Sequence, residues 1–192
     1  MADHLPLHYA LSEALIVIAA IYAVARTWPT NRWFAVGLAA AGVAALVAIV
    51  RIAGGMTGDI VILHEFLSRY GALFGLGCMG GAMLGWKAWL PPLLGVVAAG
   101  LGMTFPAATP LLLAGLILGG AALVYRRTMD QKFLAAGSFA FLLLAGLTSM
   151  PFRAEHPALS WHIFHTLVAV WYGLVATFVT ETLHSRSQGS SS

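Results

Sequence analysis

The chain has 192 residues, of which 60% are hydrophobic and only 9% are charged. A soluble domain carries about a quarter charged residues to cover its surface, so a surface this poor in charge must face lipid. The formal net charge of +3 does not indicate a nucleic-acid partner, because the Lys and Arg residues stand singly or in pairs and form no basic run.

Apolar segments of about twenty residues alternate with short connectors along the chain. About twenty helical residues, at ~1.5 Å per residue, cross a hydrocarbon core ~30 Å thick. The sequence therefore predicts an all-α, polytopic membrane helix bundle with seven transmembrane helices. In chain order they are 9–26, 34–53, 60–85, 89–105, 109–126, 132–149 and 159–181.

Two of these segments are open to a second interpretation. The segment 89–105 is short, begins near Pro91 and Pro92, and is joined to 109–126 by a linker that contains Pro106. Six transmembrane helices plus a re-entrant pair are therefore the alternative. We expect one domain over residues 1–184 and a Ser-rich disordered tail over 185–192.

Basic residues gather on one side of the predicted topology. One face receives Arg26, Arg32, Lys87, Arg126, Arg127, Lys132 and Arg186. The other receives only Arg51, Arg69 and Arg153. The positive-inside rule then predicts an amino terminus outside and a cytoplasmic carboxyl terminus, as in a bacterial inner-membrane protein.

Ionisable side chains inside membrane spans are costly and mark functional sites by default. Here they share one depth, within two turns of the outer helix ends. They are Glu13, Arg51, His64, Glu65, His162 and His165, with Arg153 and His156 in the loop before the last helix. Snorkelling at helix ends explains such residues without any function. The inner ends hold no comparable set of His and Glu residues.

Two histidines of the last predicted helix stand three residues apart, so His162 and His165 share one helix face. His64, from the third helix, lies at the same predicted depth. Three imidazoles and a water would form an open zinc site that acidifies the bound water, with Glu65 or Glu13 taking the proton. Each histidine alone is more commonly a hydrogen-bonded interfacial residue.

The segment 160–168, which reads Ser-Trp-His-Ile-Phe-His-Thr-Leu-Val, resembles the seventh-helix motif of the alkaline ceramidase and adiponectin-receptor-like superfamily. The resemblance implies a seven-helix membrane hydrolase in which zinc, held by one early and two late histidines, assists cleavage of lipid amides. His64, His162 and His165 are the matching positions. The likeness covers about ten residues and the overall topology.

The chain departs from that family pattern at two places. The family spaces its last two histidines four apart, and the residue four before His165 is Trp161. It also carries a Ser four residues before the early histidine, where this chain has Ile60. Ser68, one turn after His64, is the stand-in that the sequence offers.

Other classes of protein are compatible with the same residues. A b-type haem protein would use His64 and either His162 or His165 as axial ligands. A proton-coupled carrier would use Glu13 and Arg51, with Glu65, as a charged relay. A structural membrane protein would use these groups only to join helices. A retinal photoreceptor is almost excluded, because its Schiff base needs a lysine in a helix interior and the only lysines, Lys87 and Lys132, lie at the ends of predicted helices.

The sequence thus favours a zinc-dependent intramembrane hydrolase of lipid amides or esters, with a membrane lipid as substrate and homo-oligomerisation left open. The predicted metal ligands are His64, His162 and His165, and the predicted catalytic residues are Glu65, Glu13 and Ser68. The predicted substrate-binding residues are Arg51, Arg153 and Tyr172.

Overall fold

The computed structural model describes residues 5–85, 87–127 and 131–180, and all of its regular structure in these ranges is helical. The predicted tail, 185–192, lies outside the described residues. The helices are α1 (Tyr9–Thr27), α2 (Arg32–Ala53), α3 (Asp59–Phe66), η1 (Leu67–Gly71), α4 (Ala72–Leu84), α5 (Leu90–Thr104), η2 (Pro106–Ala108), α6 (Thr109–Arg127), α7 (Lys132–Ser149), η3 (Met150–Phe152), α8 (Pro157–Leu174) and η4 (Val175–Val179).

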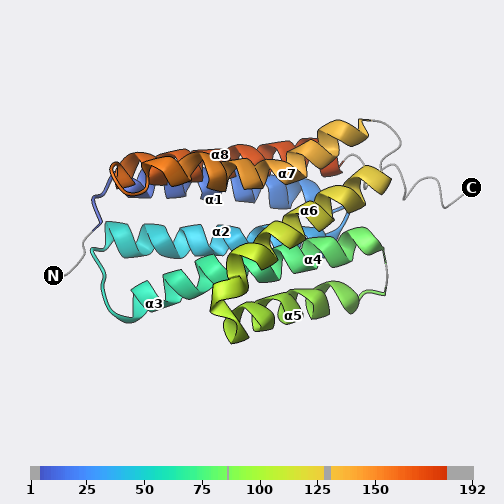
Figure 1. The fold of residues 1–192 in the computed structure, drawn as a ribbon, viewed down its shortest axis with the longest axis horizontal. Helices are drawn as coiled ribbons and strands as arrows, with labels where there is room; N and C mark the ends of the chain where they lie inside the picture. Colours follow the sequence, from blue (N-terminus) through green and yellow to red (C-terminus); the bar gives the residue numbers. More distant parts are fainter. Residues whose placement is uncertain (1–4, 86, 128–130, 181–192) are drawn as a thin grey trace, which may run out of the picture.

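The predicted fold class is confirmed, and each predicted span coincides with a helical segment (Figure 1). Within the described residues, five helices are long and apolar enough to cross a membrane: those containing α1, α2, α6, α7 and α8. The predicted span 60–85 is one helical run, α3–η1–α4, interrupted by the π-turn η1. The chain is an integral membrane protein of the helical-bundle class.

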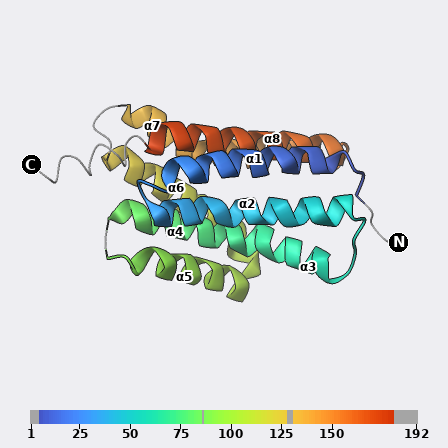
Figure 2. The same ribbon diagram turned by 180° about the vertical axis from the view of Figure 1, so that it is seen from behind.

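The helix α5 is shorter than the others and packs against α4. Its 15 residues span about 22 Å at ~1.5 Å per residue, less than the ~30 Å of a hydrocarbon core. Figures 1 and 2 show that the turn between α5 and α6 stops short of the end where α1 and α8 begin. The α5–α6 pair therefore enters from one end and turns within the length of the bundle.

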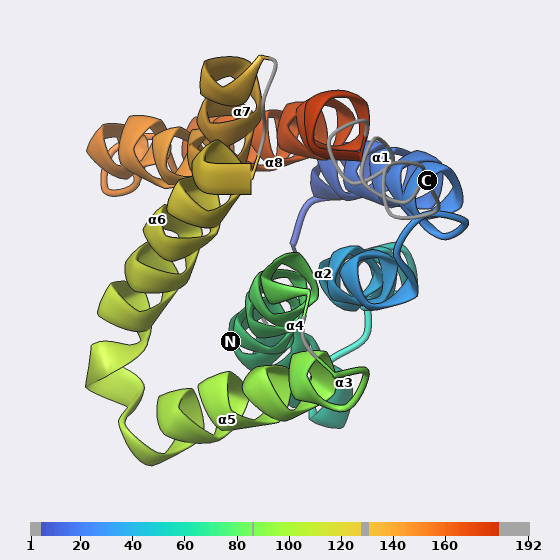
Figure 3. The same ribbon diagram turned by 90° about the vertical axis from the view of Figure 1, so that its right-hand side faces the viewer.

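The helices are held in a ring of neighbours. The helix α1 packs between α2 and α8, α7 packs between α8 and α6, and α4 contacts α2, α5 and α6 (Figure 3). The ring encloses a core whose largest fully buried side chains include Phe34, Leu38, Phe139 and Tyr172. This apolar core fills the middle of the bundle.

Glycines set the closest helix contacts. A Cβ added at Gly37 of α2 would lie 2.5 Å from the carbonyl oxygen of Gly75 in α4. A Cβ at Gly77 would lie 2.7 Å from the carbonyl oxygen of Leu94 in α5. Neither backbone pair could accept a side chain at these distances, so the small residues permit the close approach of the helices.

The two ends of the bundle differ in chemistry. At one end α1, α3 and α8 begin and α2 ends; this histidine end carries Glu13, Arg51, His64, His162 and His165. At the opposite end α1 and α4 end and α2, α5 and α7 begin. This basic end carries Arg26, Arg32, Lys87, Arg126 and Lys132 and, in the described residues, no Asp or Glu.

Candidate functional site

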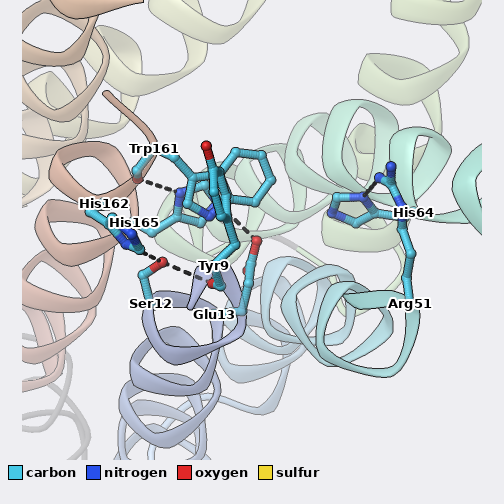
Figure 4. A network of polar contacts seen from close by, with 8 residues as sticks. All are labelled: Tyr9, Ser12, Glu13, Arg51, His64, Trp161, His162 and His165. Carbon is cyan, nitrogen blue, oxygen red and sulfur yellow. Dashed lines mark hydrogen bonds and ion pairs between the residues drawn. The ribbon is translucent and has the colours of Figure 1, made fainter. Parts of the chain in front are cut away.

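A buried carboxylate and an imidazole meet between α1 and α8 at the histidine end. The Nε2 atom of His165 lies 3.0 Å from Oε1 of Glu13 (Figure 4). The Glu13 side chain is 2% exposed and that of His165 is 13% exposed. Among the described residues, Oε1 of Glu13 has no hydrogen-bond partner, and its contact with His165 is an ion pair by distance. The burial of the carboxylate therefore depends on His165.

The other ring nitrogen of His165, Nδ1, makes a hydrogen bond. Nδ1 lies 2.7 Å from the backbone carbonyl oxygen of Trp161, one turn earlier in α8. A carbonyl oxygen only accepts, so Nδ1 carries a hydrogen. The Trp161 ring stacks on the imidazole, with ring centroids 4.3 Å apart. These two contacts fix the orientation of the ring and direct Nε2 towards Glu13.

A proton placed between Glu13 and His165 would give the packed pair no net charge. With that proton on Nε2, the pair is an imidazolium beside a carboxylate. With it on the carboxyl group, the pair is neutral and Nε2 accepts from the acid. Both arrangements have zero net charge, which is the condition under which a carboxylate and an imidazole can be buried together cheaply.

A second polar contact joins the same two helices. His162 Nδ1 lies 3.1 Å from the hydroxyl oxygen of Ser12. The Ser12 hydroxyl donates its hydrogen to the carbonyl oxygen of Tyr9. The Tyr9 ring contacts both His162 and Trp161, with centroids 5.5 and 5.1 Å apart. His162 thus belongs to a mixed polar and aromatic seam between α1 and α8.

The third contact joins α2 to α3. Nη1 of Arg51 lies 3.2 Å from Nδ1 of His64, whose side chain is buried. Because a guanidinium only donates, this nitrogen of His64 accepts, and the hydrogen of the neutral ring is on Nε2. The Glu13 carboxylate lies between His64 and His165 in Figure 4. Glu13, Arg51, His165 and Glu65 act electrostatically on His64.

The π-turn η1 follows directly after this part of α3. It spans Leu67–Gly71 and separates α3 from α4. A π-turn adds a residue to one turn and rotates the helix before it relative to the helix after it, and such turns are frequent at functional sites. Here α4 keeps its glycines against α2 and α5 while His64 of α3 faces Arg51.

Of the nine side chains predicted for a site, five lie in these contacts: Glu13, Arg51, His64, His162 and His165. Glu65, Ser68 and Arg153 are exposed. Tyr172 is fully buried further along α8, where its hydroxyl donates to the carbonyl oxygen of Leu38 over 2.8 Å.

The sequence interpretation did not select Ser12 or Trp161. Ser12 precedes the buried Glu13, and its proximity to His162 follows from the facing of α1 and α8. Trp161 takes part through its backbone carbonyl and its ring, neither of which a motif of ionisable residues reveals. Trp161 lies one helical turn before His165. This spacing of four residues was the signal in the sequence that could have indicated their contact.

Zinc bound by His64, His162 and His165 stays a prediction. Arg51 fixes the hydrogen of neutral His64 on Nε2, whereas a histidine that binds zinc through Nε2 needs its hydrogen on the other nitrogen. His162 turns Nδ1 to Ser12. Across residues 5–85, 87–127 and 131–180, no three His, Cys, Asp or Glu side chains gather closely enough to hold a metal ion.

The arrangement can accept and release protons. It combines a buried carboxylate, an imidazole with both nitrogens engaged, and a guanidinium paired with a second imidazole. Comparisons of the chain with family models, with curated proteins and with solved structures gave no match. Functional inference therefore comes from this geometry.

Proposed function

We propose that this protein is a proton-coupled membrane carrier in which Glu13 and His165 form the proton-binding site. The observation that carries the proposal is the 3.0 Å contact between a 2% exposed carboxylate and an imidazole whose other nitrogen is already bound. Buried ionisable groups that pair across membrane helices are typical of proton relays in pumps and transporters.

The coupling follows from the shared proton. While α1 and α8 are packed, the pair holds one proton and has no net charge. When the two helices separate at the histidine end, water reaches both groups and each titrates independently. Proton binding and helix separation are thermodynamically linked, because any difference in proton affinity between the packed and separated states shifts the equilibrium between them.

The contacts also favour movement at this end of the bundle. At the histidine end, Ser12, Glu13, His162 and His165 make polar contacts between α1 and α8, and these groups can be rehydrated. Further along α1 and α8, apolar core residues such as Ile16 and Tyr172 pack the two helices together. Separation that begins at the histidine end therefore breaks polar contacts and the aromatic contacts of Tyr9, and leaves the buried core packed.

We further propose that the histidine end faces outward and the basic end faces the cytoplasm of a bacterial inner membrane. The positive-inside rule supports this orientation, because six Lys and Arg residues of the described chain lie in the loops and helix termini of the basic end. The proton site would then exchange with the outer medium.

A pH jump on protein reconstituted in a solid-supported membrane tests the proposal without knowledge of the transported solute. A proton that moves from water to a buried site crosses part of the membrane field and displaces charge. Wild-type protein should give a transient current on acidification. The double variant Glu13→Gln/His165→Gln, which lacks both titratable groups, should lose it.

The matched control is Glu65→Gln/His156→Gln, which removes one carboxylate and one imidazole that are exposed at the same end. Exposed groups bind protons without crossing the field, so this variant should keep the wild-type current. An equal current in wild type and in the Glu13/His165 double variant would refute the proposal.

A further inference from the structure

The guanidinium of Arg51 carries a positive charge that no acidic side chain of the described residues neutralises by direct contact. Arg51 lies in the last turn of α2 and is only partly buried. Its polar partner in the described part of the chain is His64, whose Nδ1 lies 3.2 Å from Nη1. A neutral imidazole accepts a hydrogen from a guanidinium but offers no negative charge. The charge of Arg51 is therefore available to a ligand.

The carboxylates of the histidine end do not compete for this charge. Glu13 is the buried one, and its Oε1 atom lies 3.0 Å from Nε2 of His165. The other described acidic residues of this end are exposed; they are Asp59, Glu65 and Glu155. Within residues 5–85, 87–127 and 131–180, none of these carboxylates forms an ion pair with Arg51. An anion that reaches the guanidinium therefore displaces no carboxylate from it.

The contact with His64 also leaves hydrogen-bond donors for an anion. A guanidinium carries more N–H donors than the single one that His64 accepts. Its planar fork matches a carboxylate, which it binds through two parallel hydrogen bonds. The His64 side chain is 8% exposed, so the contact ties the guanidinium of α2 to a buried group of α3. The guanidinium is thereby held in one orientation before a ligand arrives, which lowers the entropy lost on binding.

The balance of charges selects the class of anion. Arg51 belongs to a membrane helix, where a charge without a counter-charge is costly. A monocarboxylate and one guanidinium together have no net charge, whereas a doubly charged phosphate would leave one negative charge over. The Glu13–His165 pair does not alter this balance, because in the proposed packed state it has no net charge.

We propose that Arg51, oriented by His64, binds the carboxylate of a small monocarboxylic acid at the histidine end. This inference rests on the proposed carrier function, for which it names the class of transported solute. The His64 ring lies between Arg51 and Glu13 in Figure 4, and Glu13 acts electrostatically on His64. The anion site and the proton site are thus neighbours, as the joint transport of an anion and a proton requires.

Thermal unfolding of detergent-purified protein, titrated with sodium lactate at constant neutral pH, tests this site. Sodium chloride at matched ionic strength is the reference. Lactate should raise the unfolding temperature of the wild type in a saturable manner beyond chloride, and sodium phosphate should not. Arg51→Gln should lose the lactate-specific rise. Arg51→Lys keeps the charge but not the planar fork, so it should need at least tenfold more lactate for half of the rise.

The matched control is Arg153→Gln, which removes an exposed arginine at the same end and should respond to lactate as the wild type does. Equal effects of lactate and chloride on the wild type overturn the inference. So does an unchanged lactate response in Arg51→Gln, or a phosphate response larger than that to lactate.

The pH-jump current separates this inference from the carrier proposal, because that current needs no added solute. A wild-type current that is lost in Glu13→Gln/His165→Gln, together with no lactate response, would refute the anion site alone. A lactate response that is lost in Arg51→Gln, together with equal currents in wild type and the Glu13/His165 double variant, would refute the carrier and leave the anion site.

Discussion

Removing one member of the Glu13–His165 pair should destabilise the bundle far more than removing both. At 3.0 Å, two unit charges attract by about 5.5 kcal/mol at an effective dielectric constant of ~20. His165→Leu leaves Oε1 of a buried carboxylate with no hydrogen-bond or ion-pair partner among the described residues. That carboxylate can take up a proton instead, which at pH 7 costs an ordinary glutamate about 3.7 kcal/mol and limits the loss.

We therefore expect a coupling free energy of about 2–4 kcal/mol from the cycle of Glu13→Leu, His165→Leu and the double variant. Unfolding in mixed micelles of rising sodium dodecyl sulfate content, followed by circular dichroism, measures each free energy of unfolding. The cycle at Ser12 and His162 is the matched control, because it joins the same two helices through neighbouring residues.

The control pair is a hydrogen bond of uncharged groups, for which membrane proteins give coupling energies near ~0.6 kcal/mol. The result that would refute the reasoning is a Glu13–His165 coupling no larger than the Ser12–His162 coupling. It would mean that the carboxylate is satisfied by water or by another group, and that no proton is shared across the interface.

The remaining predictions concern packing and metal content. Gly37→Ala should destabilise the protein by about 1–3 kcal/mol, because its Cβ would lie 2.5 Å from the Gly75 carbonyl oxygen. Gly80→Ala is the control and should not destabilise the protein, because nothing lies within 4 Å of its added Cβ. The free energy of unfolding of both variants tests this prediction. Tyr172→Phe should cost about 1 kcal/mol in the same assay, through its lost hydrogen bond to Leu38. Elemental analysis of purified protein should find less than one zinc per chain; stoichiometric zinc would instead support the lipid hydrolase that the sequence favours.

The sequence predicted the helices well because a membrane span needs only length and apolar composition, which local residues supply. It could not predict the π-turn at Leu67–Gly71, which no local pattern distinguishes from an α-helix. The common depth of Glu13, His64 and His165 followed from counting residues along each helix. Depth along an axis is therefore the part of a membrane site that sequence reveals most directly.

The partners of these residues could not be predicted, because they depend on how each helix is rotated about its axis. Arg51 was predicted to bind a lipid headgroup, and its guanidinium contacts His64. That contact fixes the hydrogen of neutral His64 on Nε2. His162 and His165 share a helix face as predicted, yet one contacts Ser12 and the other Glu13.

Proton-linked separation of α1 and α8 is the central claim, and a distance measured between spin labels at Leu11 and Leu159 tests it most directly. Both positions are exposed near the histidine end, and Cys78→Ala removes the only native cysteine. Labels at Ile21 and Val170, further along the same helices, are the control.

In the proposed mechanism, acidification adds a second proton to the Glu13–His165 pair, while the guanidinium of Arg51 stays against His64. A net positive charge is then buried, and the pair should separate. We expect the Leu11–Leu159 distance to lengthen on acidification while the Ile21–Val170 distance stays constant, and the lengthening to vanish in Glu13→Gln/His165→Gln. A Leu11–Leu159 distance that does not change with pH in the wild-type background would contradict the account.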